Sequence, residues 1–312
     1  MIIFDDLEKI SEVPETAIAL GNFDGVHLGH QKLIGEAVRK AKEKGIKSAV
    51  FTFSNHPRDL VPGTEKVKNI LYSTEKAEVI ESLGIDYLFS IPFTKEIMAM
   101  SPESFIQELL CDKFNAKVVV CGFNYNFGYK AQGTPEILQE IGKKKGFEMV
   151  MIPPCKVDGN VVSSTLIREF IADGKMEDVK KYMGRNYIVS GEVVVGNRLG
   201  RRIGFPTSNL VIEENMVTPP NGVYVTLCEY NDKVFPGITN VGVKPTIGNY
   251  NKNIETHIFN FDQEIYGKKI KVEFIKKMRE EIKFDNVEAL SRQIKSDCLD
   301  AEAFHRANGY LL

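Results

Sequence analysis

A glycine-rich turn between a short strand and a helix constrains this chain more than any other stretch. Apolar residues 17–20 predict a buried strand, and apolar residues recur at helical spacing over 33–41 until Gly45 ends the run. Between them lies the sequence GNFDGVHLGH, residues 21–30. Exposed backbone N–H groups and the positive end of the helix dipole make such a turn an anion site.

Two imidazoles, His27 and His30, stand at this junction. They add hydrogen-bond donors that strengthen as negative charge builds on a phosphate. Gly29 has no side chain, so a nucleotide can lie close to the backbone. The alternatives are an ordinary turn or a zinc pair, but zinc needs further ligands, and this half offers only His56 and no cysteine pair. The sequence favours a site for a nucleoside triphosphate.

Length, charge and cysteine usage limit the class of protein. The chain has 312 residues, too many for one average domain and suitable for two. Its formal net charge of −2 argues against nucleic acid or an anionic membrane as a partner. We see no apolar run long enough to span a bilayer, and the five scattered cysteines lack a C-x-x-C pair. Reduced thiols in a cytoplasmic protein are the expectation.

The first half of the chain alternates between strands and helices. Ser101–Pro102 and Thr134–Pro135 have the cap-and-proline pattern typical of helix starts. Alternation of apolar strands with helices predicts a parallel sheet covered on both faces, with ligands bound beyond the carboxyl ends of the strands. The loops 21–30, 53–58 and 121–133 all leave such ends. The further predicted elements are strands at 48–53, 86–91, 117–121 and 147–152, and helices at 74–83, 101–115 and 134–146.

The periodicity changes after Met183, which predicts a domain boundary between 1–183 and 184–312. Beyond it, alternating apolar residues and Asn, Asp and Gly turns predict a small antiparallel β-barrel. Residues 285–299 add one amphipathic helix, with Val287, Leu290, Ile294 and Leu299 on its apolar face. The predicted strands are 187–195, 222–230, 233–241, 254–261 and 268–275.

Two other stretches of the first half suggest ligand contacts. Ser163 and Ser164 are candidate N-caps of a helix that continues through Thr165 to Arg168, and hydroxyls beside a guanidinium suit nucleotide phosphates. Serine caps are common, so this signal is weak alone. The aromatic loop 121–128 is either a packed turn or a stacking surface for a flat ring.

A run with three glycines and three arginines, residues 196–209, is the informative stretch of the second half. Its N–H groups and guanidiniums can fold over a polyphosphate, while Thr207 and Asn209 offer hard oxygen ligands for magnesium. The P-loop pattern G-x-x-x-x-G-K-[ST] is absent from the chain, and a basic hairpin loop is the alternative. On the companion strand 254–259, Glu255 is placed either as a proton acceptor or as a solvated surface residue.

These motifs resemble those of two enzyme families. The string GNFDGVHLGHQ and the serine-rich motif ending in Arg168 resemble the nucleotidylyltransferase superfamily, in its bacterial FAD synthetase branch. The PTSN motif at 206–209, the Glu-Thr-His strand at 255–257 and the REEIKF segment at 279–284 resemble riboflavin kinases. The chain departs from the usual residues at three positions: Asn55 stands for Pro, Tyr125 for Phe and Ser208 for Ala.

The resemblance implies a Rossmann-like domain that transfers AMP to FMN, giving FAD, followed by a barrel that phosphorylates riboflavin. It implies small-molecule partners (ATP, riboflavin and FMN), Mg²⁺ with the ATP, and a monomer or weak homo-oligomer. The implied catalytic residues are Glu255 as base and His27, His30 and Arg168 as charge-stabilising donors, with Thr207 and Asn209 holding the metal. The implied ATP-binding residues are Gly21, Asn22, Phe23, Asp24, Gly29, Ser163, Ser164, Thr165, Gly196, Gly200, Arg201 and Gly204. The implied flavin-binding residues are His56, Pro57, Phe123, Asn124, Tyr125 and Arg279.

Two rival functions remain at this point. One is a cytidylyl- or pantetheine-type transferase with an unrelated barrel attached. The other is a non-catalytic flavin-binding regulator, which would be expected to have lost the residues at Glu255, Thr207 or His27. All three are present.

Overall fold

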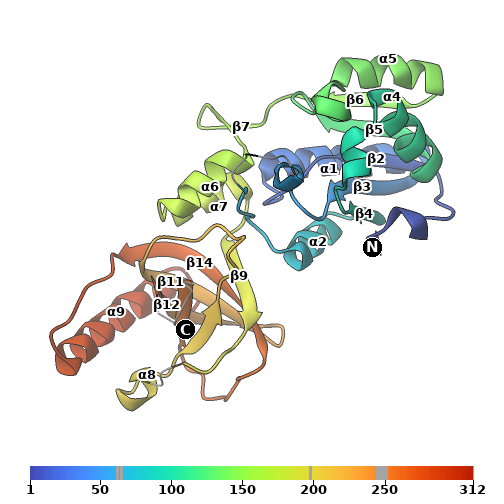
Figure 1. Cartoon of the computed structure of the whole chain (residues 1–312). Helices are drawn as coiled ribbons and strands as arrows, with labels where there is room; N and C mark the ends of the chain where they lie inside the picture. Colours follow the sequence, from blue (N-terminus) through green and yellow to red (C-terminus); the bar gives the residue numbers. More distant parts are fainter. Residues whose placement is uncertain (61–62, 64–65, 197–198, 244–251, 312) are drawn as a thin grey trace. The chain divides into compact units, whose positions relative to one another are not determined.

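The computed structural model describes residues 1–60, 63, 66–196, 199–243 and 252–311. Asn197 and Arg198 of the glycine-rich run lie outside these ranges, as do residues 244–251. The chain divides into two compact units (Figure 1). The first comprises Met1–Val67 with Tyr72–Ser164, and the second Lys68–Leu71 with Thr165–Leu312.

The first unit contains a six-stranded parallel sheet, with its strands in the order β1-β4-β3-β2-β5-β6. Strand β2 lies between β3 and β5, so the chain builds the sheet first to one side of β2 and then to the other. Ligands of open α/β sheets bind at such a switch point. The strands are β1 Ile2–Phe4, β2 Thr16–Leu20, β3 Lys47–Phe53, β4 Tyr87–Ile91, β5 Ala116–Gly122 and β6 Glu148–Ile152.

Both faces of this sheet are covered, as the continuous apolar strands predict. On one face, alternate strand residues such as Ile18 and Phe51 pack with Phe105 and Leu138 in a large apolar cluster. On the other, α1 contacts β2, β3 and β5. The helices of the first unit, with short β7 and β8, are η1 Leu7–Lys9, α1 Leu28–Lys44, η2 Pro57–Leu60, α2 Ser73–Ser82, α3 Lys95–Ala99, α4 Pro102–Ser104, η3 Phe105–Lys113, η4 Tyr129–Ala131, α5 Pro135–Lys145, β7 Lys156–Val157 and β8 Asn160–Val161.

Caps confirm two of the predicted helix starts and two of the predicted helix ends of this unit. Ser101 and Thr134 accept hydrogen bonds from the first turns of their helices, each followed by proline at the first position. Gly45 ends α1 and Gly146 ends α5, both in the left-handed conformation. The predicted helix 101–115 continues past α4 as a π-helix rather than an α-helix.

The second unit contains a six-stranded antiparallel sheet in the order β10-β13-β12-β11-β14-β9. Its two edges meet where the Val194 N–H donates to the Asn209 carbonyl at 2.9 Å, so the sheet is a nearly closed barrel. Strand β10 was not predicted from the sequence. The elements are α6 Ser164–Ala172, α7 Met176–Met183, β9 Tyr187–Glu192, α8 Leu199–Arg202, β10 Ser208–Val211, β11 Gly222–Tyr230, β12 Lys233–Val243, β13 Lys252–Ile258, β14 Lys269–Arg279 and α9 Val287–Ala307.

Helix α9 lies beside β12 (Figure 1), and it buries a different stripe from the one predicted. Val287 and Leu299 are exposed, and the predicted apolar face is wrong at these two positions. The buried positions are Asp297, Cys298, Ala301 and His305. Cys298 and Ala301 pack on barrel residues such as Val225 and Ile238, and Asp297 and His305 make hydrogen bonds, so small and polar side chains occupy the contact.

Within the described residues, no helix is both long and apolar enough to cross a membrane. All five cysteines are free thiols, as their spacing predicts. Helix α7 contacts β9 and β14, and the compact units therefore group it with the barrel although it precedes residue 184.

Candidate active sites

The glycine-rich turn of the first unit joins β2 to α1 at the switch point of the sheet. Phe23 and Val26 both have positive φ angles, 49° and 36°, and both are completely buried. Bulky residues rarely adopt this conformation, and such strain clusters at functional sites. The turn is therefore held in one shape by its packing.

His27 is the N-cap of α1. Its Nδ1 accepts the backbone N–H of His30 at 3.2 Å, so the neutral His27 ring carries its proton on Nε2. The rings of His27 and His30 stack, with centroids 3.6 Å apart. A Cβ on Gly29 would come within 3.2 Å of the His27 ring, so this glycine also makes room for the imidazole. The structure brings the two predicted imidazoles together.

Two side chains attach other segments to the same turn. The Ser164 hydroxyl donates to the Asp24 carbonyl at 2.9 Å. This bond joins the serine-rich motif to the glycine-rich turn. The Thr52 hydroxyl donates to the Asn22 carbonyl, also at 2.9 Å. Thr52 lies near the carboxyl end of β3, so this bond holds the turn after β2 against that strand.

Arg168 belongs to the second compact unit, like its neighbour Thr165. Its Nε donates to the Lys68 carbonyl at 2.7 Å. The short segment Lys68–Leu71 is itself bound by the barrel unit, because the Asn69 N–H donates to the Asn215 carbonyl at 2.7 Å. Arg168 therefore holds this segment in the second unit.

Lys76 is a cation of the first unit that sequence reasoning missed. Its Nζ donates to the Phe53 carbonyl at 3.2 Å, at the carboxyl end of β3. Burial lowers the pKa of this ammonium group, an effect that the charge of Asp24 partly offsets. A positive charge between the loops after β2 and β3 suits an anionic ligand. No sequence pattern marks Lys76 as a site residue, because it lies in an amphipathic helix among other charged residues.

The loop after β3 is held by Asn55, one of the three residues that depart from the family pattern. Its side chain donates to the Phe93 carbonyl at 3.1 Å and accepts the Phe93 N–H at 2.6 Å. His56 Nδ1 accepts the Arg58 N–H at 3.2 Å, and Pro57 begins η2. Asn55 thus orders the loop that carries the two predicted flavin-side residues.

The aromatic loop after β5 presents one ring to solvent and packs another. Phe123 is 44% exposed, whereas Tyr125 stacks on Phe127 with ring centroids 5.8 Å apart. Burial raises the pKa of the Tyr125 phenol well above its usual range. Asn124 is exposed beside Phe123. Phe123 is therefore the ring of this loop that is available to stack on a ligand.

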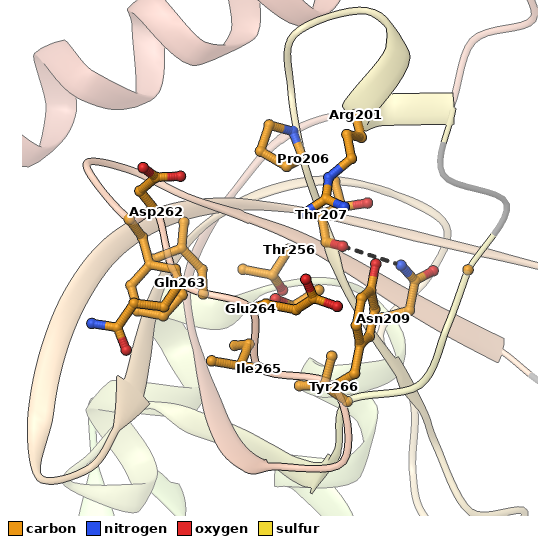
Figure 2. Close-up of a pocket in the computed structure, with 15 residues that line it drawn as sticks. Arg201, Pro206, Thr207, Asn209, Thr256, Asp262, Gln263, Glu264, Ile265 and Tyr266 are labelled. Atoms are coloured by element: carbon orange, nitrogen blue, oxygen red, sulfur yellow. Dashed lines mark hydrogen bonds between the residues drawn. The ribbon is translucent and has the colours of Figure 1, made fainter.

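The second unit contains a pocket of about 390 Å³ (Figure 2). One wall comes from the glycine-rich run and β10, including Gly196, Arg201, Thr207 and Asn209. The His257 Nδ1–H donates to the Pro206 carbonyl at 2.8 Å and so holds this wall to β13. The other wall is the loop 261–266, whose polar side chains sequence reasoning missed because it lies past the end of the predicted strand.

Thr207 and Asn209 lie two residues apart on one side of the chain. Asn209 is 4% exposed, and its amide Nδ2 lies 3.4 Å from the Thr207 carbonyl, the contact dashed in Figure 2. A Cβ on Gly196 would lie 2.6 Å from the same amide, so only glycine lets the loop pack there. A hydroxyl and an amide carbonyl are hard oxygen donors of the kind Mg²⁺ takes, and they fit a bound magnesium nucleotide.

Glu255 lies directly opposite Asn209 in the β10–β13 register and opposite Asn240 in the β12–β13 register. The three side chains therefore face the same side of the sheet. Glu255 is half-buried, and among the described residues it is not part of the pocket lining. Glu255 therefore lies beside the pocket, next to Asn209, which is part of the lining.

Arg279 makes a bidentate ion pair with Asp297 of α9, at 2.9 and 2.6 Å. The Nη1 of the same guanidinium group donates to the Glu280 carbonyl at 2.8 Å. Asp297 is 5% exposed and also accepts from Gln293 at 2.9 Å. Charge-assisted bidentate pairs are strong, so Arg279 fixes α9 to the end of β14.

Models of two enzyme families match this chain, one after the other along the sequence. A model of the FAD synthetase family matches residues 9–166, and a model of the riboflavin kinase family matches residues 183–305. A bifunctional riboflavin kinase/FMN adenylyltransferase of Bacillus subtilis is 36% identical over 297 residues, which are 93% of this chain and 92% of that protein. One of Haemophilus influenzae is 34% identical, over 92% of this chain and 94% of that protein.

The chain belongs to the family of bifunctional riboflavin kinase/FMN adenylyltransferases. A crystal structure described as a macrolide-efflux protein from Streptococcus pneumoniae has the same two-part fold, with a TM-score of 0.88 and 30% identity. It covers 96% of this chain, which covers 98% of it. The residues 167–182 between the two family matches contain most of α6 and α7.

Proposed function

We propose that this member of the bifunctional family makes FAD from riboflavin in two ATP-dependent reactions, each performed by its own site. The observation that carries the proposal is that each compact unit contains most of one family match and one glycine-rich loop. We assign adenylyl transfer to residues 1–183 and phosphorylation to residues 184–312, the predicted domains.

In the barrel, Glu255 accepts the proton of the riboflavin 5′-hydroxyl. The hydroxyl oxygen forms a bond to the γ-phosphorus of ATP as the bond to the bridging β–γ oxygen breaks, giving FMN and ADP. Gly196, Gly200, Arg201 and Gly204 close over the phosphates. Thr207 and Asn209 hold the magnesium that enters with ATP, which supplies charge neutralisation at the phosphates. Because Arg279 is engaged by Asp297, we infer that it serves the flavin chiefly by placing α9.

In the first unit the FMN phosphate is already an anion, so no base is required. One of its oxygens bonds to the α-phosphorus of ATP, and pyrophosphate leaves. His27 and His30 donate to the developing charge from the N-terminus of α1, where the helix dipole acts in the same sense. Residues 21–24, Gly29, Ser163 and Ser164 bind the nucleotide. The loops with His56, Pro57 and Phe123 to Tyr125 hold the flavin.

The test is a time course with riboflavin, ATP and magnesium, with the flavins separated by chromatography. We expect FMN to appear first and FAD to follow, and FMN supplied directly to give FAD without riboflavin. CTP and phosphopantetheine serve as alternative substrates for the rival transferase reactions. Absence of FMN and FAD from a folded protein, or turnover of phosphopantetheine in their place, would overturn the proposal.

A further inference from the structure

Asn253 is a buried amide next to the proposed kinase site that has no role in the function above. It lies two residues before Glu255 on β13 and is 8% exposed. Its Nδ2 lies 3.1 Å from Asn209 Oδ1 and 3.1 Å from Glu255 Oε1. An amide nitrogen carries two hydrogens, so Asn253 donates one to each of these oxygens.

This pair of bonds determines which way both amides face. A carboxylate only accepts hydrogen bonds, so Asn253 must present its nitrogen to Glu255. The same nitrogen then requires an oxygen from Asn209, because two amide nitrogens at this distance would repel each other. Asn209 is left with its Oδ1 toward Asn253 and its Nδ2 toward the Thr207 carbonyl, as found. The negative charge of Glu255 thus sets the orientation of Asn209 through Asn253.

Among the described residues, the side chain of Asn253 donates to these two neighbours and does not itself line the pocket. The residues that line the 390 Å³ pocket, in the part of the chain that is described, include Asn209 and Thr207 but not Asn253. Asn209 is confined from the other side by Gly196, whose backbone leaves no room for a Cβ. A buried amide that loses such a donor either leaves an unsatisfied oxygen or rotates.

We propose that Asn253 is a positioning residue for phosphoryl transfer: its amide fixes the metal-binding oxygen of Asn209 and the carboxylate of Glu255 relative to each other. The proposal rests on the proposed riboflavin kinase function. Residues that orient the ligands of a metal typically change metal affinity or activity by about 10–100-fold when they are removed. The effect should appear in kcat and in the magnesium requirement rather than in riboflavin binding.

The test compares Asn253→Ala and the isosteric Asn253→Asp with wild type in the full chain. We expect both variants to lower kcat for FMN formation about 10–100-fold and to raise the Mg²⁺ concentration needed for half-maximal rate. Riboflavin binding, followed by quenching of its fluorescence, should stay unchanged. FAD formation from supplied FMN should also stay unchanged, and it reports that the chain is folded.

Asn186 provides the matched control. It is equally buried, at 8% exposure, and its Nδ2 also donates to a carboxylate, Glu273 Oε2, at 3.0 Å. Asn186→Ala should lower thermal stability while kcat and the magnesium requirement stay at wild-type values. If Asn253 had only a structural role, Asn253→Ala would likewise lower thermal stability and leave kcat and the magnesium requirement unchanged.

A double-mutant cycle sharpens the result. In an Asn209→Ala background, Asn253→Ala should lower kcat by less than it does in wild type, because part of its effect passes through Asn209. If both Asn253 variants keep kcat and magnesium dependence within twofold of wild type, the positioning role is wrong and the proposed kinase function still stands. If wild type itself makes no FMN, it is the proposed function that fails.

Discussion

The two halves of this molecule use the same substrate, ATP, but place their polar groups on different parts of their sheets. The adenylyl-transfer unit places its polar groups in loops at the ends of parallel strands, around the N-terminus of α1. The kinase unit places them on the strands themselves, where Asn209 and Glu255 face each other across β10 and β13. In our proposal only the second needs a base, because its nucleophile is a neutral hydroxyl while the first uses a phosphate that is already charged.

The difference shows how each fold supplies rigidity. A loop at the end of a strand has no neighbouring strand to hold it, so other contacts must do so. In the turn after β2 these contacts come from buried Phe23 and Val26, the His27 cap and the Ser164 hydroxyl. A strand is already held by its neighbours, so in the barrel one extra amide, Asn253, is enough to connect the two groups. The following predictions separate the two constructions, from the largest expected effect to the smallest.

Glu255→Gln should remove the proton acceptor and keep the shape of the side chain. We expect FMN formation from riboflavin to fall about 10²–10⁴-fold, the usual contribution of a general base. FAD formation from supplied FMN should not change, since the other unit makes it. Chromatography of both reactions on the same preparation checks this, and equal loss of both activities would contradict the separation of the sites.

His30→Ala should do the reverse. Loss of one donor to the developing charge costs about 2.7–4 kcal/mol, or roughly 10²–10³ in rate. We expect FAD formation from FMN to fall by this factor while riboflavin phosphorylation stays near wild type. If this variant, while folded, stops FMN formation as well, the assignment of two independent sites is wrong.

Gly196→Ala should disturb the barrel site through packing alone. The new Cβ would meet the Asn209 amide at 2.6–2.7 Å and displace it. We expect a kinase loss of about 10–100-fold, similar to other changes next to a metal ligand. The control is Gly35→Ala in α1, where a Cβ meets nothing within 4 Å and neither activity should fall.

His305 should make the barrel the acid-sensitive half. It is completely buried, its Nε2–H donates to the Gly237 carbonyl at 3.0 Å, and its Nδ1 makes no hydrogen bond within the described residues. Burial lowers its pKa from the usual value. The unfolded chain therefore takes up the proton first, and stability is lost as pH falls below about 6.5, by at most ~1.4 kcal/mol per pH unit.

Thermal inactivation of the two activities, measured side by side at several pH values, checks this sign. The kinase midpoint should fall as the pH is lowered from 7 toward 5, and it should fall less in His305→Gln than in wild type. The adenylyl-transfer activity should not respond to this substitution. A wild-type midpoint that is no more acid-sensitive than that of the variant would contradict the prediction.

Phe123→Ala should have the smallest effect. Loss of one exposed stacking ring is worth about 0.5–1.5 kcal/mol, so we expect the KM for FMN to rise a few-fold with little change in kcat. Tyr129, at 45% exposure in the same loop region, is the matched control, and Tyr129→Ala should leave the KM unchanged. Equal effects of the two changes would mean that Phe123 does not stack on the flavin.

The sequence by itself determined most of the elements and most of the candidate groups of both units. Apolar periodicity, caps such as Thr134 and end signals such as Gly45 act over a few residues, so they can be read locally. The histidine pair and the Pro206–Asn209 motif are contiguous for the same reason. Local patterns also predicted the parallel sheet, the barrel and the helix that follows it.

Tertiary structure alone decided which distant groups meet. Nothing local indicates that Lys76 reaches the end of β3, that Arg279 pairs with Asp297, or that Asn253 lies within reach of Asn209. Strand register and the closing of the barrel set these distances. They depend on the whole packed sheet, because a shift of one residue would turn every side chain of a strand to its other face.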